Sequence, residues 1–170
     1  MIPVSYKNDS GRAWVTINNP PVNATSRAVR SGLYEAVDKA VKDGCRTGVI
    51  VCAGKTFVAG GDISEFGKPA LEPHLPDVYR HIERSPVIWA AALHGNVLGG
   101  GFELAMACHI RVALQGTRFG LPEVNLGLIP GAGGTQRLPR LIGAEMAAHL
   151  ASSGRLIDAQ SLFKLSLIHI

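Results

Sequence analysis

The first part of the chain alternates between apolar and polar residues in the manner of paired strands. Two such segments, residues 4–8 and 13–18, flank the turn-forming triplet Asp9-Ser10-Gly11 and predict a β-hairpin. The prolines of Asn19-Pro20-Pro21 end the second strand. Helical spacing replaces the alternation over residues 26–42, where apolar residues return every three or four positions. Thr25 or Ser26 at the start and Gly44 just past the end fit the two ends of a helix.

Short apolar runs and helical patterns alternate over the rest of the chain. The apolar runs predict buried strands at residues 47–53, 87–93 and 110–113. The helical patterns predict helices at residues 78–84, 99–108, 133–141, 144–152 and 158–164. Three prolines interrupt residues 67–76, which predicts a mobile loop. Strands that alternate with helices place the chain in the α/β class.

The composition is that of a folded globular domain. Of the 170 residues, 46% are hydrophobic and 18% are charged, so we expect one domain over residues 1–170 with a real core. The net charge of +4 fits an anionic ligand and an ordinary surface equally well. It comes without the basic run of a nucleic-acid surface, so no nucleic-acid partner is expected. No apolar run approaches the ~18 residues of a membrane helix, so no membrane span is expected either.

Cysteines and histidines show no pattern typical of a disulfide framework or a metal site. The three cysteines form no C-x-x-C pair, and Cys52 and Cys108 lie in apolar runs that predict buried free thiols. With no secretion signal at the start, this predicts a cytoplasmic location in a bacterium, or otherwise a reducing intracellular compartment. The six histidines lack close ligand spacing, so no metal is expected.

Two glutamates lie beside glycine-rich backbone in apolar surroundings. Glu103 falls in the first turns of an apolar helix, and Glu123 precedes the apolar run 124–129. Burying a carboxylate is costly and raises its pKa, which suits a group that transfers protons. For Glu103 the alternative is a helix-terminal glutamate that is stabilised by the helix dipole. For Glu123 the alternative is a solvent-exposed loop carboxylate. The residues alone leave both interpretations open.

Two glycine-rich turns offer free backbone N–H groups. Gly99-Gly100-Gly101 lets a ligand approach the backbone at a helix N-terminus, and Ala59-Gly60-Gly61-Asp62 is a second such turn. Donors of this kind can hold a developing oxyanion, although a tight strand-to-helix turn is the simpler alternative.

The sequence does not match the common nucleotide-binding motifs. Gly54-Lys55-Thr56 lacks the glycine of a phosphate-binding loop five positions earlier, and residues 131–136 lack the third glycine of the dinucleotide fingerprint.

Taken together, these motifs resemble the crotonase superfamily, the enoyl-CoA hydratases and isomerases. The resemblance covers nearly the whole chain, with matching segments in the family's order at residues 19–24, 59–63, 94–95, 99–105 and 122–138. Residues 19–24 and Ala107-Cys108-His109 look most like the N-terminal hydratase/isomerase region of multifunctional fatty-acid β-oxidation proteins. The resemblance implies an α/β fold of repeated ββα units wound into a spiral. It also implies that the chain stops before the C-terminal helical region, which usually builds a homotrimer or joins a multifunctional complex.

The resemblance implies roles for particular positions. Glu103 and Glu123 would be the catalytic acid/base pair, and the N–H groups of Gly61 and Gly100 would form the oxyanion hole. The N–H of Gly131 would help to hold the reacting water. Further positions would border the bound CoA: Asn23, Ala24, Ala59, Gly60, Asp62 and Ile63.

The implied reaction is hydration of a 2-trans-enoyl-CoA to a 3-hydroxyacyl-CoA in fatty-acid β-oxidation. Double-bond isomerisation would be a second activity, but it needs only one of the two glutamates, so the presence of both favours hydration. The CoA thioester would be the substrate, and no cofactor is expected. Another crotonase-type reaction on an acyl-CoA stays open, and so does a non-catalytic or assembly-dependent acyl-CoA-binding fragment. His109 is expected to be packed or hydrogen-bonded rather than catalytic.

Overall fold

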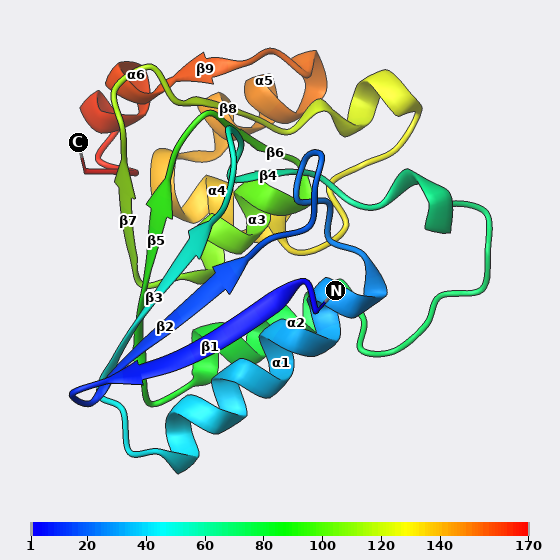
Figure 1. The fold of residues 1–170 in the computed structure, drawn as a ribbon. Coiled ribbons are helices and arrows are strands. Elements are labelled where there is room, and N and C mark those ends of the chain that lie inside the picture. The colour runs from blue at the N-terminus through cyan, green and yellow to red at the C-terminus, as the bar shows by residue number, and fades with distance from the viewer. Residues whose placement is uncertain (1, 170) are drawn as a thin grey trace.

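The computed structural model describes residues 2–169 and arranges them as two sheets with helices packed around them (Figure 1). The strands are β1 Val4–Asp9, β2 Arg12–Ile17, β3 Thr47–Cys52, β4 Val58–Ala59, β5 Ile88–Leu93, β6 Asn96–Leu98, β7 Ile110–Ala113, β8 Arg118–Gly120 and β9 Ile157–Asp158. The α-helices are α1 Arg27–Lys42, α2 Leu75–Arg84, α3 Gly100–Ala107, α4 Gly134–Ile142, α5 Ala144–Ser153 and α6 Ala159–Lys164. Two short 3₁₀ helices are η1 Ile63–Glu65 and η2 Pro122–Leu126.

The sheets are built by a repeated β-β-α unit. The first sheet has the order β1-β2-β3-β5-β7, and the second has the order β4-β6-β8-β9. In each unit one strand joins the first sheet, the next joins the second sheet, and a helix follows: β3-β4-α2, β5-β6-α3 and β7-β8-α4. Neighbouring units pair in parallel within both sheets. The predicted ββα spiral is therefore confirmed.

The N-terminal hairpin and the first helix form as the sequence predicts. β1 pairs antiparallel with β2, with Val4 opposite Ile17. The Ser26 side chain accepts a hydrogen bond from the N–H of Val29, so Ser26, one of the two predicted candidates, caps α1. α1 then lies beside α2 and β1 (Figure 1).

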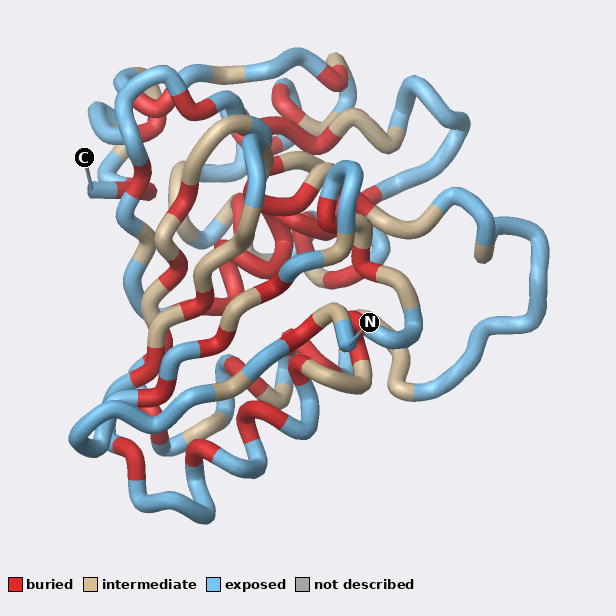
Figure 2. The backbone as a smooth tube through the Cα atoms, in the orientation of Figure 1, coloured by how far each residue is buried: buried red, intermediate tan, exposed pale blue. Residues whose placement is uncertain are grey.

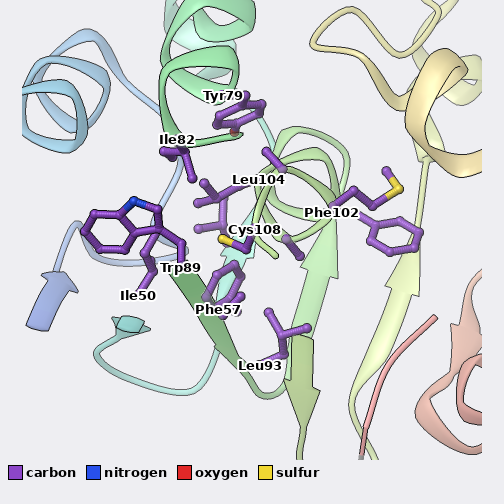
Figure 3. Close-up of a cluster of buried hydrophobic side chains, with 14 of the residues drawn as sticks. Ile50, Phe57, Tyr79, Ile82, Trp89, Leu93, Phe102, Leu104 and Cys108 are labelled. Atoms are coloured by element: carbon purple, nitrogen blue, oxygen red, sulfur yellow. The ribbon is translucent and has the colours of Figure 1, made fainter. Parts of the chain in front are cut away.

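The core centres on α3, all of whose residues are buried (Figure 2). Helices that are apolar on every side are buried on every side. Its Phe102 and Leu104 belong to the same cluster of buried side chains as Trp89 of β5 and Tyr79 of α2 (Figure 3). Glu103 is the one charged residue of α3, and it is buried like its apolar neighbours.

Three details differ from the sequence prediction. β4, β6, β8 and β9 were not predicted, because segments of two or three residues are too short to show a period. α2 begins at Leu75, inside the predicted loop, because Pro76 in its first turn loses no helical hydrogen bond. Cys108 is buried as predicted, but Cys52 is only half-buried.

Within residues 2–169, each helix is either too short or too polar to pass through a lipid bilayer.

Candidate active site

Glu103 is held in the first turn of α3 by backbone amides from a distant loop. Its Oε1 accepts hydrogen bonds from the N–H groups of Ala132 at 2.8 Å and Gly134 at 2.7 Å. The residue is only 2% exposed. One carboxylate oxygen is thus fixed by two charge-assisted hydrogen bonds, which set the direction of the whole group.

The loop before α4 reaches Glu103 because glycines let it approach. Gly133 has a φ of 104°, in the left-handed region, and a Cβ on Gly134 would lie 3.0 Å from Oε1 of Glu103. Arg137 of α4 steadies the loop by donating to the carbonyl of Ala132 at 2.9 Å. The same guanidinium binds both carboxylate oxygens of Glu83 in α2, at 3.1 and 2.9 Å.

Glu123 lies in η2 and enters the same site without comparable support. The residue is half-buried, and its Oε2 is buried with no hydrogen-bond partner among the residues that the structure describes. Its Oε1 lies close to Gly99, where an added Cβ would stand 2.9 Å from that oxygen. The φ of 50° and ψ of −124° at Gly99 also suit glycine.

Burial raises the pKa of both carboxyls, but the groups that surround them differ. Burial raises the pKa of Glu103, while the amides of Gly134 and Ala132 and the charge of Arg137 oppose that rise. Burial also raises the pKa of Glu123, and the negative charge of Glu103 raises it further, against a backbone hydrogen bond that lowers it. Glu103 therefore has more groups that stabilise its ionised form.

Gly61 and Gly100, the two predicted oxyanion donors, both line the cavity that these carboxyls enter. Neither the N–H of Gly61 nor that of Gly100 donates to another backbone group among residues 2–169. α3 packs so closely on β4 that a Cβ on Gly101 would stand 2.2 Å from the carbonyl oxygen of Val58. This contact brings the two glycine-rich turns together.

A cavity of about 360 Å³ collects most of the predicted site residues. It is lined by Ala59, Gly60, Gly61, Ile63, Gly100, Glu103, Glu123 and Gly131. Its remaining walls are mainly apolar side chains that sequence reasoning missed: Phe66, Leu75, Pro76, Leu126, Leu128 and Ile129. Their signal was the presence of large apolar residues in segments otherwise rich in glycine and proline, where a loop exposed only to water would not need them.

Asn23, Ala24 and Asp62 do not line this cavity. The buried Asn23 amide donates to the carbonyls of Ala53 and Thr56, and its oxygen accepts from the N–H of Asn19. Asp62 caps η1 through the N–H of Ser64. These side chains shape the loops around the site, and their contact with CoA stays a prediction.

Two other predictions concern residues away from the cavity. His109 accepts a hydrogen bond through Nδ1 from the N–H of Trp89 at 3.1 Å, so it is hydrogen-bonded as expected. Within residues 2–169, no three His, Cys, Asp or Glu side chains are close enough together to hold a metal ion.

Comparison with known proteins agrees with this geometry. Residues 7–169 match the family model described as enoyl-CoA hydratase/isomerase. The chain is 46% identical to a zebrafish (Danio rerio) peroxisomal bifunctional enzyme, over 92% of this chain but only 22% of that protein. It is 42% identical to a probable enoyl-CoA hydratase of Bacillus subtilis, over 100% of this chain and 69% of that protein.

A solved structure of an enoyl-CoA hydratase from Thermoplasma volcanium superposes with a TM-score of 0.90 at 31% identity. The match covers 99% of this chain and 71% of that structure. The fold, the order of the glycine-rich motifs and the sequence match agree, and the chain belongs to the enoyl-CoA hydratase/isomerase family of the crotonase superfamily.

Proposed function

We propose that the chain hydrates a 2-trans-enoyl-CoA to a 3-hydroxyacyl-CoA in fatty-acid β-oxidation. The observation that carries the proposal is the unequal environment of two carboxyls in one cavity. Oε1 of Glu103 accepts two N–H bonds, whereas Oε2 of Glu123 is buried with no partner among residues 2–169. The first arrangement favours a carboxylate and the second a carboxylic acid, so the pair suits one base and one acid.

The steps of hydration follow from these two protonation states. The thioester oxygen accepts hydrogen bonds from the N–H groups of Gly61 and Gly100. Glu103 takes a proton from a water held by the N–H of Gly131, and that water bonds to Cβ. The electron pair of the double bond moves toward the thioester as an enolate, and Glu123 then gives its proton to Cα. One water is added across the double bond, and no electrons leave the substrate. Glu103 then releases its proton to solvent and Glu123 takes one up, which restores the starting state.

Stabilisation of the enolate oxygen is the main electrostatic contribution. Backbone donors fixed by the fold need no reorganisation during the reaction, and one such donor contributes roughly 3 kcal/mol in comparable sites. The apolar walls exclude water and strengthen these bonds. No step requires a metal or a redox cofactor, and the CoA thioester is the substrate.

The proposal also covers the residues that border CoA, the assembly of the protein and its compartment. Asn23, Ala24, Ala59, Gly60, Asp62 and Ile63 border the CoA portion, three of them through the cavity wall and the others through the loops behind it. The chain spans less than a quarter of the zebrafish protein it matches. As the resemblance implies, we propose a homotrimer or a multifunctional complex for the full-length protein, and a cytoplasmic location in a bacterium or otherwise a reducing intracellular compartment.

Hydration is tested directly by adding crotonyl-CoA and following the loss of the conjugated thioester absorbance. The unaltered chain is expected to turn over, and Glu123→Gln is expected to lower kcat by about a hundred-fold or more, because glutamine has no proton to give to Cα. Binding of crotonyl-CoA without turnover would favour the non-catalytic fragment instead. Turnover of a 3-enoyl-CoA would add isomerisation.

The raised carboxyl pKa values predict the shape of the pH profile. Glu103 must be ionised to act as a base, so kcat/KM is expected to fall as the pH drops through its raised pKa. This acid limb should lie above the ordinary glutamate value of about 4.3. Activity should also fall at high pH as Glu123 loses its proton. A rate profile flat from acid to neutral pH would contradict the assignment of Glu103 as base.

A further inference from the structure

We propose that Thr25 is a positioning residue for the oxyanion hole, acting on the peptide bond between Gly60 and Gly61. The inference rests on the proposed function, because it assigns a support to one of the two proposed donors. Thr25 does not line the cavity. It acts through the far end of the peptide that does.

The two ends of one peptide unit are mechanically and electronically linked. The carbonyl of Gly60 and the N–H of Gly61 belong to the same planar amide. The Gly60 oxygen accepts two hydrogen bonds from Thr25, one from its N–H at 3.0 Å and one from its Oγ1 hydroxyl at 3.3 Å. Two donors on the oxygen fix the plane of the amide, and they polarise it so that its N–H becomes a better donor.

The second oxyanion peptide has the same arrangement from a different source. The N–H of Gly100 belongs to the peptide whose carbonyl is that of Gly99. That oxygen also accepts two hydrogen bonds, from the N–H groups of Phe102 at 2.8 Å and Glu103 at 3.0 Å. The first turn of α3 supplies both. No helix follows directly after the peptide at Gly60. Its carbonyl therefore receives its two hydrogen bonds from Thr25, which lies in another segment of the chain.

Thr25 is itself held firmly enough to position another group. It is 1% exposed, and its carbonyl accepts a hydrogen bond from Nη1 of Arg30 at 3.0 Å. The buried Arg30 also pairs with Glu65 at 2.7 Å and donates to the carbonyls of Leu71 and Pro73. The start of α1 and the segment after η1 are thereby joined around Thr25.

The conformational freedom of Gly60 explains why the hydrogen bond from the Thr25 hydroxyl matters. Gly60 has a φ of 106°, and the nearest atom that an added Cβ would meet is 3.9 Å away. Gly60 therefore has no side chain to limit rotation of its peptide, and the space beside its Cα that a Cβ would take is open. The hydroxyl bond is the part that a side-chain substitution can remove while the N–H bond of Thr25 stays.

The experiment compares Thr25→Val with Thr25→Ser. Valine keeps the shape and the backbone N–H but removes the hydroxyl, so we expect kcat to fall about 3- to 10-fold, the effect of one hydrogen bond, with KM changed less than about two-fold. Serine keeps the hydroxyl and should keep most of kcat. Thr117→Val is the matched control, because Thr117 is also 1% exposed and bonds the carbonyl of Leu114, away from the cavity. Its kcat should not change.

A spectroscopic measurement separates polarisation from simple packing. Butyryl-CoA, isotope-labelled at its thioester carbonyl, has no double bond to hydrate, and its carbonyl stretch should move to lower frequency on the unaltered chain. Thr25→Val should reverse part of that shift, and Thr117→Val should not. If Thr25→Val does not fold, Thr25→Ala makes the same comparison.

The outcomes keep this inference distinct from the proposed function. A kcat and a carbonyl shift that are the same in Thr25→Val and in the unaltered chain would overturn the role of Thr25 and leave the hydratase proposal standing. Butyryl-CoA that binds the unaltered chain with no carbonyl shift would instead remove the oxyanion hole itself. A shift that weakens in Thr25→Val supports the inference even in a chain that does not turn over.

Discussion

Replacing Glu103 with glutamine is expected to lower kcat for enoyl-CoA hydration by about a thousand-fold while the fold stays intact. Glutamine has nearly the same shape, and its amide oxygen can accept the same bonds from Ala132 and Gly134. It cannot take a proton from water, and general base catalysis contributes about a hundred- to ten-thousand-fold. The measurement is the rate of loss of crotonyl-CoA absorbance at saturating substrate.

Glu103→Gln should lower kcat without lowering the free energy of unfolding. Because burial raises the pKa of Glu103, the folded state binds the proton more tightly than the unfolded state. The stabilisation from this difference is fully present below the ordinary glutamate pKa and is lost as pH rises through the raised one. At neutral pH the ionised Glu103 therefore costs stability, and glutamine removes that cost. Denaturant unfolding of Glu103→Gln at neutral pH should give a free energy at least equal to that of the parent.

The matched control is Glu145→Gln, on the exposed first turn of α5. It removes one exposed carboxylate that does not line the cavity, so kcat should stay the same and the free energy of unfolding should fall by no more than about 1 kcal/mol, the contribution of an acidic side chain at a helix N-terminus. A Glu103→Gln variant that keeps most of its kcat would contradict the base role. A variant that loses both kcat and stability would show that Glu103 matters to packing instead.

The sequence could predict the elements in which apolar residues recur at a regular spacing. The hairpin, α1 and the apolar helix α3 all repeat over enough residues to reveal one buried face or complete burial. The second sheet could not be found in this way. Its strands are two or three residues long, and they exist because neighbouring ββα units place them side by side. This is tertiary context rather than local pattern.

The candidate site divides in a similar way. Glu103, Glu123 and the glycine-rich turns stood out because charge and backbone freedom are unusual in apolar surroundings. The amides that hold Glu103 lie about thirty positions further along the chain, and nothing in their own sequence points to that contact. Asn23 shows the opposite case. Its place in a recognisable motif predicts contact with CoA, which stays a prediction, but the motif did not reveal that its buried amide donates to loop carbonyls.

Gly101→Ala is expected to cost about 3 kcal/mol or more of the free energy of unfolding. The added Cβ would stand 2.2 Å from the carbonyl oxygen of Val58 and 2.6 Å from its Cβ. Real atoms do not approach so closely, and neither the β4 backbone nor the buried helix α3 can move freely in a packed core. Denaturant unfolding of the variant measures the loss.

The same substitution should also lower kcat in whatever fraction stays folded. Relief of the clash must push α3 away from β4, and this separates the N–H of Gly100 from that of Gly61. Gly131→Ala is the control for stability, since its Cβ would meet nothing closer than 4.0 Å and its free energy of unfolding should change by less than about 1 kcal/mol. A Gly101→Ala chain as stable as its parent would mean that α3 and β4 do not meet as closely as described. The two proposed oxyanion donors would then lose the contact that sets their spacing.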